Sequence, residues 1–118
     1  MNVPSITVEE TKEILEKDKD VILLDVRTAG ENTMSKIANS ILKPLNEIQG
    51  DTSDLDKNKK ILIYCATGSR SQIACNILQN EGFENCFDVS GGISAWQRAG
   101  FEIEKGENIN PFAQMFGL

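Results

Sequence analysis

The sequence predicts an α/β fold with a mainly parallel central sheet flanked by helices. Two short apolar runs, Val21–Leu24 and Ile61–Tyr64, have the continuous hydrophobicity of strands that are covered on both faces. Around them lie segments in which apolar residues recur every three or four positions, as on one face of a helix. Strands that alternate with helices form layered folds with a parallel sheet, and 118 residues suffice for one such domain.

Local signals predict the elements of the first third of the chain. Thr7 and Glu10 have the spacing of a capping box, so a helix of about ten residues is expected behind Thr7. Val21–Leu24 is then expected to be a central strand. Residues 28–35 are helix-like or irregular, and residues 40–42 are expected to form a short strand.

The middle of the chain leads back into the sheet. Pro44 is suited to open a short helix that runs through Ile48, and the charged residues 51–60 are expected to form a solvated surface loop. The strand Ile61–Tyr64 shares the buried character of Val21–Leu24, so we expect the two strands to lie side by side.

The last third is expected to hold a longer helix and a third strand. Apolar residues repeat every three or four positions from Ser71, and Gly82 supplies the helix stop. Phe87–Val89 has the character of a buried strand. Gly91-Gly92 then breaks the chain before a short final helix at Ile93–Trp96.

Composition excludes several classes of function. The net charge of −6 argues against a nucleic-acid or anionic-membrane partner, and the absence of histidine removes imidazole acid/base and metal chemistry. No stretch approaches the length of a membrane span. Cys65, Cys75 and Cys86 are odd in number and form no C-x-x-C pair, so neither a disulfide framework nor a zinc site is indicated. We expect a cytoplasmic protein with reduced thiols and no cofactor.

The most informative stretch places a cysteine directly behind a strand. Cys65 follows the run ILIY, four small residues separate it from Arg70, and a helix begins behind them. The free N–H groups and the positive dipole at a helix start stabilise a thiolate or a bound anion. The alternative is that Cys65 is a buried small hydrophobe and that Arg70 pairs with a surface carboxylate. The glycine in the loop and the closing arginine favour a nucleophile in an anion-binding loop.

Three separated segments carry a resemblance to a known family. They are LLDVR at Leu23–Arg27, CATGSRS at Cys65–Ser71 and DVSGGISAW at Asp88–Trp96. In order and spacing they resemble the single-domain rhodanese-like sulfurtransferases, over about residues 5–105. The resemblance implies the three-layer rhodanese-like fold.

The resemblance also implies a reaction and its site. Cys65 would accept a sulfane sulfur as a persulfide and pass it to a thiol or cyanide acceptor. The donor would be a small anion such as thiosulfate or a persulfide. The loop would hold the sulfur or the anionic donor through these residues: Ala66, Thr67, Gly68, Ser69 and Arg70.

Two other functions stay open. Arsenate reductases and phosphatases also use a cysteine, an amide cradle and an arginine, but the phosphatase loop has one residue more, which suits a tetrahedral oxyanion. A non-catalytic rhodanese-like module for interaction or sensing is the second alternative. The presence of both Cys65 and Arg70 argues against it.

Residues outside the loop are interpreted as mainly structural. Asp25 and Arg27 could form a second layer around the site, with Arg27 pairing with a carboxylate such as Glu31. Cys75 and Cys86 are expected to pack in the interior rather than act as resolving thiols. Trp96 is expected in the core.

The segment behind LLDVR departs from the family pattern. The family usually has an aromatic residue and then Gly-His-Ile, whereas this chain has Asn32 and then Ser35-Lys36-Ile37. Lys36 is expected to be a solvated surface lysine, and if it faced the pocket it would attract an anionic donor. Gly91-Gly92 is expected to permit a positive φ or a close approach to the Cys65 loop.

The sequence divides at residue 105. Residues 1–105 form the predicted domain, and residues 106–118 form a tail. In the tail, Pro111 and the apolar Phe112, Met115 and Phe116 predict a short amphipathic helix. This helix would dock on its own domain, or contact a second subunit in a homodimer or a partner protein.

Overall fold

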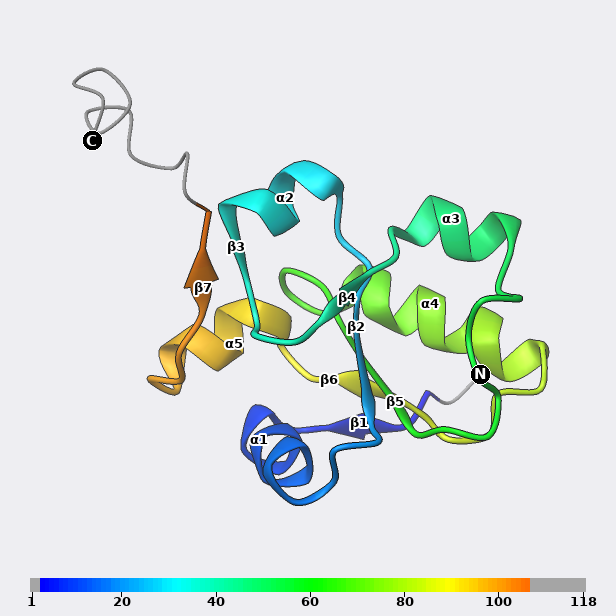
Figure 1. The fold of residues 1–118 in the computed structure, drawn as a ribbon, viewed down its shortest axis with the longest axis horizontal. Coiled ribbons are helices and arrows are strands. Elements are labelled where there is room, and N and C mark those ends of the chain that lie inside the picture. The colour runs from blue at the N-terminus through cyan, green and yellow to red at the C-terminus, as the bar shows by residue number, and fades with distance from the viewer. Residues whose placement is uncertain (1–2, 107–118) are drawn as a thin grey trace.

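The computed structural model describes residues 3–106 and shows one parallel sheet between two layers of helices (Figure 1). The sheet has five strands in the order β1-β6-β5-β2-β4, and every neighbouring pair is parallel. The strands are β1 (Ser5–Ile6), β2 (Ile22–Asp25), β4 (Ile41–Leu42), β5 (Ile61–Tyr64) and β6 (Cys86–Val89). The predicted fold class and the neighbourhood of the two apolar strands are therefore confirmed.

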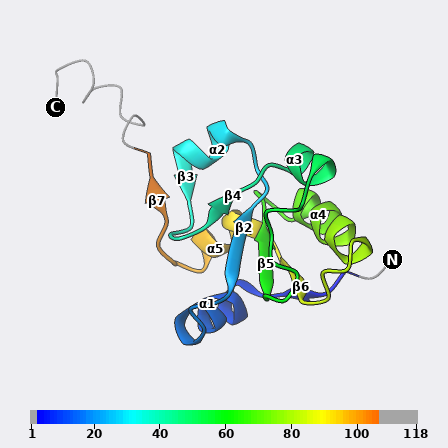
Figure 2. The same ribbon diagram turned by 45° about the vertical axis from the view of Figure 1, so that its right-hand side comes forward.

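Helices cover both faces of the sheet. The helices are α1 (Val8–Lys17), α2 (Ala29–Met34), α3 (Leu45–Gly50), α4 (Ser69–Asn80) and α5 (Gly92–Arg98). Helices α3 and α4 pack on one face, and α1 and α5 pack on the other (Figure 2). Helix α2 lies at the end of the sheet where β2 and β5 finish (Figure 1).

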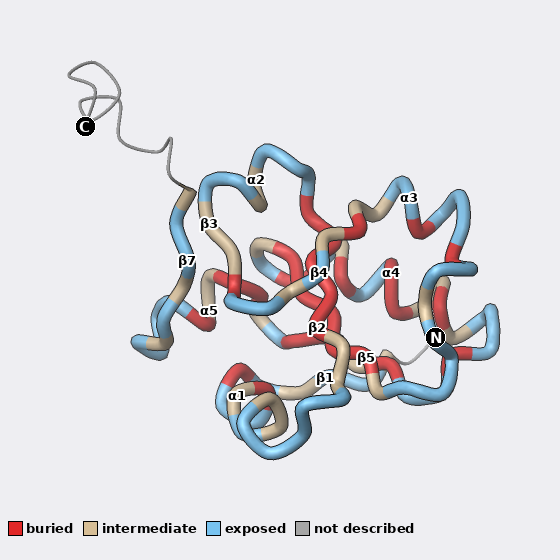
Figure 3. The backbone as a smooth tube through the Cα atoms, in the orientation of Figure 1, coloured by how far each residue is buried: buried red, intermediate tan, exposed pale blue. Residues whose placement is uncertain are grey.

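The strand side chains divide the core into two clusters. Leu24, Ile61 and Ile63 point into the cluster that α3 and α4 cover. Leu62 and Tyr64 point into the cluster on the α1 and α5 side. Because successive strand residues face opposite sides, a strand covered on both faces must be apolar throughout. Figure 3 shows the result, with β2 and β5 mostly buried and the outer sides of the helices exposed.

Most predicted elements are present with small shifts at their ends. The Thr7–Glu10 capping box is formed in both directions, with hydrogen bonds of 2.9 and 3.0 Å. Helix α4 begins at Ser69, two residues before the predicted Ser71, so Arg70 lies in its first turn. Pro44 is the N-cap of α3 rather than its first residue. Residues 51–60 contain no helix or strand, as predicted.

Three short strands were not predicted. Besides β1, they are β3 (Ser35–Lys36) and β7 (Glu104–Lys105), which form an antiparallel pair. A strand of two residues has no measurable periodicity, so its position is decided by its partner strand. The domain boundary at residue 105 stays a prediction, and the predicted tail helix lies outside the described residues. Within residues 3–106, no helix has the length and apolar character needed to cross a membrane.

The start of α5 lies directly against the loop behind β5. Ile93 and Ser94 donate backbone hydrogen bonds of 2.9 and 3.1 Å to the carbonyl oxygens of Cys65 and Ala66. Gly92 has φ +59°, and a Cβ there would overlap these carbonyl groups. The predicted positive φ and close approach at Gly91-Gly92 are thus confirmed, and α5 fixes the backbone of the loop.

Replacement of Gly92 by alanine should destabilise the protein by at least about 2 kcal/mol, because the new Cβ meets backbone and the φ is unfavourable. Urea denaturation measures this change in the free energy of unfolding. Gly50→Ala is the matched control: a Cβ at Gly50 has no neighbour within 4 Å, so this variant should be unchanged or more stable by up to about 1 kcal/mol. Equal stability of Gly92→Ala and wild type would contradict the packing described above.

Candidate active site

The candidate site lies where the carboxyl ends of the central strands meet. Cys65 follows β5 and is 1% exposed. Its Sγ accepts a hydrogen bond of 3.0 Å from the backbone N–H of Gly68, the N-cap of α4. Gly68 has φ +118°, a left-handed backbone conformation that turns the chain from the loop into α4. The loop therefore brings the sulfur to the positive end of a 12-residue helix.

The remaining predicted loop residues differ in how far they are buried. Gly68 is buried with Cys65, whereas Thr67 and Ser69 are exposed at the outside of the loop. Ala66 is half-buried, and its carbonyl group is held by α5. The sequence thus identified a contiguous loop, and the structure divides it into an inner side at Gly68 and an outer side.

Arg70 is bound by a carboxylate of another element. Its Nη1 and Nη2 donate to Oε1 and Oε2 of Glu31 on α2, at 2.7 and 2.9 Å. Glu31 also accepts hydrogen bonds from Thr28, with which it forms the capping box of α2. The Arg70 hydrogen bonds, followed by those of Thr28, lower the pKa of Glu31 to about 2 against the opposing effect of burial. This pair connects α2 to the first turn of α4 beside the loop.

Arg27 pairs locally with a carboxylate, as predicted, but the partner is Asp25 and not the suggested Glu31. Arg27 turns back on Asp25, with hydrogen bonds of 2.9 Å from Nε and 2.8 Å from Nη2. Both residues are buried, at 3% and 0% exposure. Burial opposes the charge of Arg27, but the hydrogen bonds and charge of Asp25 outweigh it and raise the pKa of Arg27. Glu31 instead accepts hydrogen bonds from Thr28 and Arg70.

Asp25 is also the acceptor for two further elements. The Asn32 amide donates to its Oδ2 at 3.0 Å, and the Tyr64 hydroxyl donates to the same oxygen at 3.2 Å. Asn32 stands where the resembled family has an aromatic residue, and here it anchors α2 by a hydrogen bond instead. Asp25 and Arg27 thus support the site from below and do not contact Cys65 through any hydrogen bond in the described structure.

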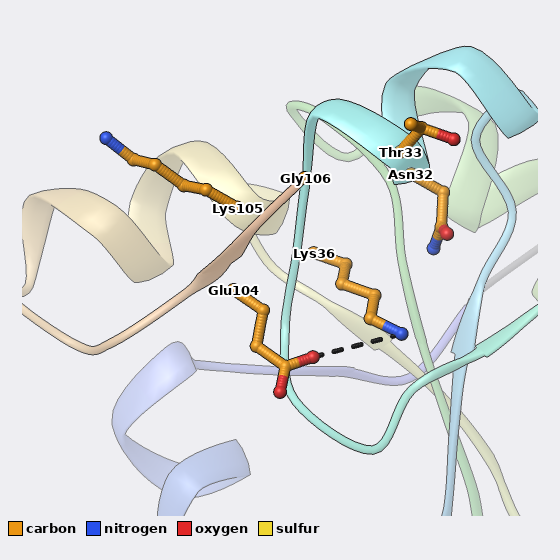
Figure 4. A pocket seen from close by; sticks show the side chains of 6 residues that line it. All are labelled: Asn32, Thr33, Lys36, Glu104, Lys105 and Gly106. Carbon is orange, nitrogen blue, oxygen red and sulfur yellow. Dashed lines mark ion pairs between the residues drawn. The ribbon is translucent and has the colours of Figure 1, made fainter. Parts of the chain in front are cut away.

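Lys36 lies at a surface hollow of about 610 Å³ next to α2. Figure 4 shows its ammonium group paired with Glu104, while the side chain of Lys105 points away. The Lys36 Nζ is 3.8 Å from Glu104 Oε1, and its side chain is 38% exposed. Lys36 therefore forms a long ion pair between β3 and β7 at the edge of this hollow, rather than being a fully solvated lysine.

Sequence reasoning missed two residues behind Cys65: Ser71, which contacts its sulfur, and Asp88, which binds Ser71. The Ser71 hydroxyl lies 3.4 Å from the Cys65 sulfur and donates a hydrogen bond to Oδ1 of Asp88. Asp88 lies in β6 and is 1% exposed. In the sequence, the signal for Asp88 is a charged residue within the otherwise apolar run that forms β6.

The other two cysteines are fully buried on the α4 side of the sheet. Cys75 of α4 and Cys86 of β6 are both 0% exposed and belong to the same core cluster as Cys65. The hydrogen bond with Cys75 and burial raise the pKa of Cys86 above its usual value. Their burial supports the predicted packing role. Within residues 3–106, no group of histidine, cysteine and carboxylate side chains has the arrangement of a metal site.

Comparisons with known proteins agree on one family. The family model described as "Rhodanese-like domain" matches residues 7–99. A sulfurtransferase from Allochromatium vinosum is 34% identical over 86% of this chain and 94% of its own length. Thiosulfate sulfurtransferase GlpE from Coxiella burnetii is 30% identical over 70% of this chain and 78% of its own. The crystal structure of a rhodanese-related protein from Thermoplasma volcanium superposes with a TM-score of 0.78, at 35% identity, over 86% of this chain and 97% of that one.

The pairing of Glu31 with Arg70 should make stability depend on pH. Because the pKa of Glu31 falls from 4.5 to about 2 on folding, its contribution is present above about pH 4.5 and is lost as the pH falls toward 2. Glu31→Gln should therefore lower the free energy of unfolding by roughly 1 kcal/mol at pH 7, and the difference from wild type should vanish near pH 2.

Urea denaturation between pH 2 and 7 tests this dependence. Glu47→Gln is the control, since Glu47 is an exposed carboxylate in the first turn of α3. A Glu31→Gln difference that stays constant over this pH range would show that the ion pair does not act as described.

Proposed function

The chain belongs to the rhodanese-like domain family, and from this membership and the geometry of its loop we propose that it is a sulfurtransferase that carries sulfane sulfur on Cys65. The observation that carries the proposal is the hydrogen bond of 3.0 Å from the Gly68 N–H to the Cys65 sulfur at the start of α4. A donor in this position, reinforced by the helix dipole, stabilises negative charge on sulfur, both in the thiolate and in a persulfide.

The proposed reaction has two steps. In the first, the Cys65 sulfur attacks the outer sulfur of thiosulfate. A new sulfur–sulfur bond forms, the old one breaks, and sulfite leaves with the bonding electron pair. In the second step, a thiol or cyanide takes the outer sulfur, and the electron pair returns to Cys65. Thiosulfate is proposed as donor because it is small and anionic, and because it appears in the name of the Coxiella burnetii relative.

Arg70 is proposed to bind the anionic end of the donor. Its guanidinium has five N–H groups, and Glu31 takes one from each terminal nitrogen. The remaining N–H groups have no hydrogen-bond partner within residues 3–106 and can form charge-assisted hydrogen bonds to sulfonate oxygens. In this arrangement Glu31 fixes the direction of the arginine fork.

The reaction sets conditions on the surroundings of the protein. An unpaired nucleophilic thiol is kept in a reducing compartment, and the three cysteines of this chain are all free. The proposed setting is therefore the cytoplasm, as the cysteine pattern predicts.

Replacement of Cys65 by serine should abolish sulfur transfer, because a hydroxyl cannot hold a sulfane sulfur under these conditions. The assay follows thiocyanate from thiosulfate and cyanide, together with the gain of one sulfur atom by intact mass. Cys75→Ala is the matched control and should keep both readouts. Sulfur uptake by Cys65→Ser would refute the assignment, and a wild type that takes up no sulfur from thiosulfate or from a small persulfide would favour the interaction module. Phosphate release from an aryl phosphate that depends on Cys65 would favour a phosphatase.

Replacement of Arg70 by alanine should raise the KM for thiosulfate by roughly 10- to 100-fold, since one or two charge-assisted hydrogen bonds are lost. Steady-state kinetics at constant ionic strength measure the change. Arg98→Ala removes an equal charge from an exposed position at the end of α5, and its KM should stay near that of wild type. Equal KM values for the two variants would exclude Arg70 from donor binding.

A further inference from the structure

The proposed reaction leaves one question open, which is where the proton of the Cys65 thiol goes. The chain has no histidine, the usual general base beside a nucleophilic cysteine. The amide of Gly68 only donates, so it stabilises a thiolate but cannot accept its proton. An acceptor within the protein therefore has to be a side chain that reaches the sulfur.

Ser71 is placed to pass on that proton. Its Oγ is 3.4 Å from the Cys65 sulfur, 3.1 Å from the carbonyl oxygen of Gly68, and hydrogen-bonded to Oδ1 of Asp88. A hydroxyl is both a donor and an acceptor, so with its own proton directed to Asp88 its lone pairs can accept the S–H proton. Ser71 is 0% exposed, so water does not compete for these positions.

Asp88 differs from the other deeply buried carboxylate, Asp25. Asp25 is paired with Arg27, whereas no ion pair to Asp88 is formed within residues 3–106. Among the described residues its two oxygens accept from hydroxyl groups only, from Ser71 and, at 3.1 Å, from Ser5 of β1. Burial of a charge without an opposite charge is costly, and a proton arriving from Cys65 would remove that cost.

We propose that Ser71 and Asp88 form a proton relay for Cys65, in which Ser71 contacts the reacting sulfur and Asp88 is a positioning residue that stores the proton. This inference deepens the proposed sulfur transfer and rests on it. As the sulfur attacks, the S–H proton moves to the Ser71 oxygen and the Ser71 proton moves to Asp88 Oδ1. The electron pair of the S–H bond forms the new bond to the sulfane sulfur, and sulfite leaves. When the acceptor removes that sulfur, the proton returns along the same path.

Two other titratable groups face the relay, both from α4. Arg70 faces Cys65: the pKa of its guanidinium is raised mainly by Glu31, against burial, and to a smaller extent by the Cys65 sulfur. Cys75 faces Asp88: its hydrogen bond with Cys86 lowers its pKa, while burial and the charge of Asp88 act in the raising direction. Neither group lies on the path from Cys65 to Asp88.

The relay predicts a pH dependence with a distinctive sign. A relay in which Cys65 and Asp88 share one proton predicts that wild-type reactivity stays level over a range of mildly acidic pH. With asparagine at position 88 there is no acceptor, so reactivity should fall about tenfold per pH unit as the thiolate is lost. If Asp88 acted only through its negative charge, the neutral asparagine would favour the thiolate and speed the reaction instead.

The experiment measures the rate of Cys65 modification by methyl methanethiosulfonate between pH 4 and 8, with peptide mapping to assign the modified thiol. This small reagent transfers a thiomethyl group and needs no sulfurtransferase turnover. Asp88→Asn and Ser71→Ala should each react about 100-fold more slowly at pH 5 and lose the level region. The double variant should be no slower than either single one, because both interrupt one path. Arg98→Ala, at an exposed position at the end of α5, does not contact the relay and should keep the wild-type profile.

Each outcome bears on the relay separately from the sulfur transfer. Unchanged or faster modification of Asp88→Asn overturns the relay, and so do multiplicative losses in the double variant. If Asp88→Asn unfolds, as circular dichroism would show, Ser71→Ala provides the same test. A wild type with the level region, but without sulfur uptake from thiosulfate, would support the relay while refuting the proposed donor.

Discussion

The buried carboxylate of Asp25 is the constraint on which the arrangement of the site depends. Its two oxygens accept hydrogen bonds from the Arg27 backbone and guanidinium, from Asn32 and from Tyr64. These donors come from the end of β2, from α2 and from β5, so one side chain fixes how three elements meet. Helix α2 has no buried residue of its own. The hydrogen bond from Asn32 to Asp25 therefore attaches this helix to the end of the sheet.

The Cys65 loop is held from three sides by interactions that differ in kind. Helix α5 binds its carbonyl oxygens, Glu31 of α2 binds Arg70 at its end, and Asp88 of β6 binds Ser71 behind it. The backbone carbonyl groups of the loop, the guanidinium of Arg70 and the hydroxyl of Ser71 are thus each fixed by a different element. In the proposed reaction, a loop preorganised in this way would stabilise charge on the Cys65 sulfur.

The sequence was informative where function and structure depend on neighbouring residues. The apolar runs predicted β2 and β5 and their adjacency, and the spacing of Cys65, Gly68 and Arg70 predicted a loop at a helix start. Sequence reasoning failed where the partner lies far along the chain. Glu31 and Arg70 are 39 positions apart, and Ser71 and Asp88 are 17 apart. Such pairs are decided by the order of strands in the sheet, which no local pattern contains. A charged residue within an apolar strand, as at Asp88, was the available signal.

The pairing of β1 with β6 has a consequence for how the protein is made. Pro4 accepts a hydrogen bond of 2.8 Å from the Asp88 backbone, and Ser5 binds its side chain across 83 positions of sequence. The environment of Asp88 is therefore complete only after residues from both ends of the domain have met. Contacts this distant in sequence form late, because the loop between them costs entropy to close. In a chain still on the ribosome, from which residue 88 has not yet emerged, Cys65 would lack these surroundings. Under the proposed relay, the reactivity of Cys65 would therefore develop only when the domain folds.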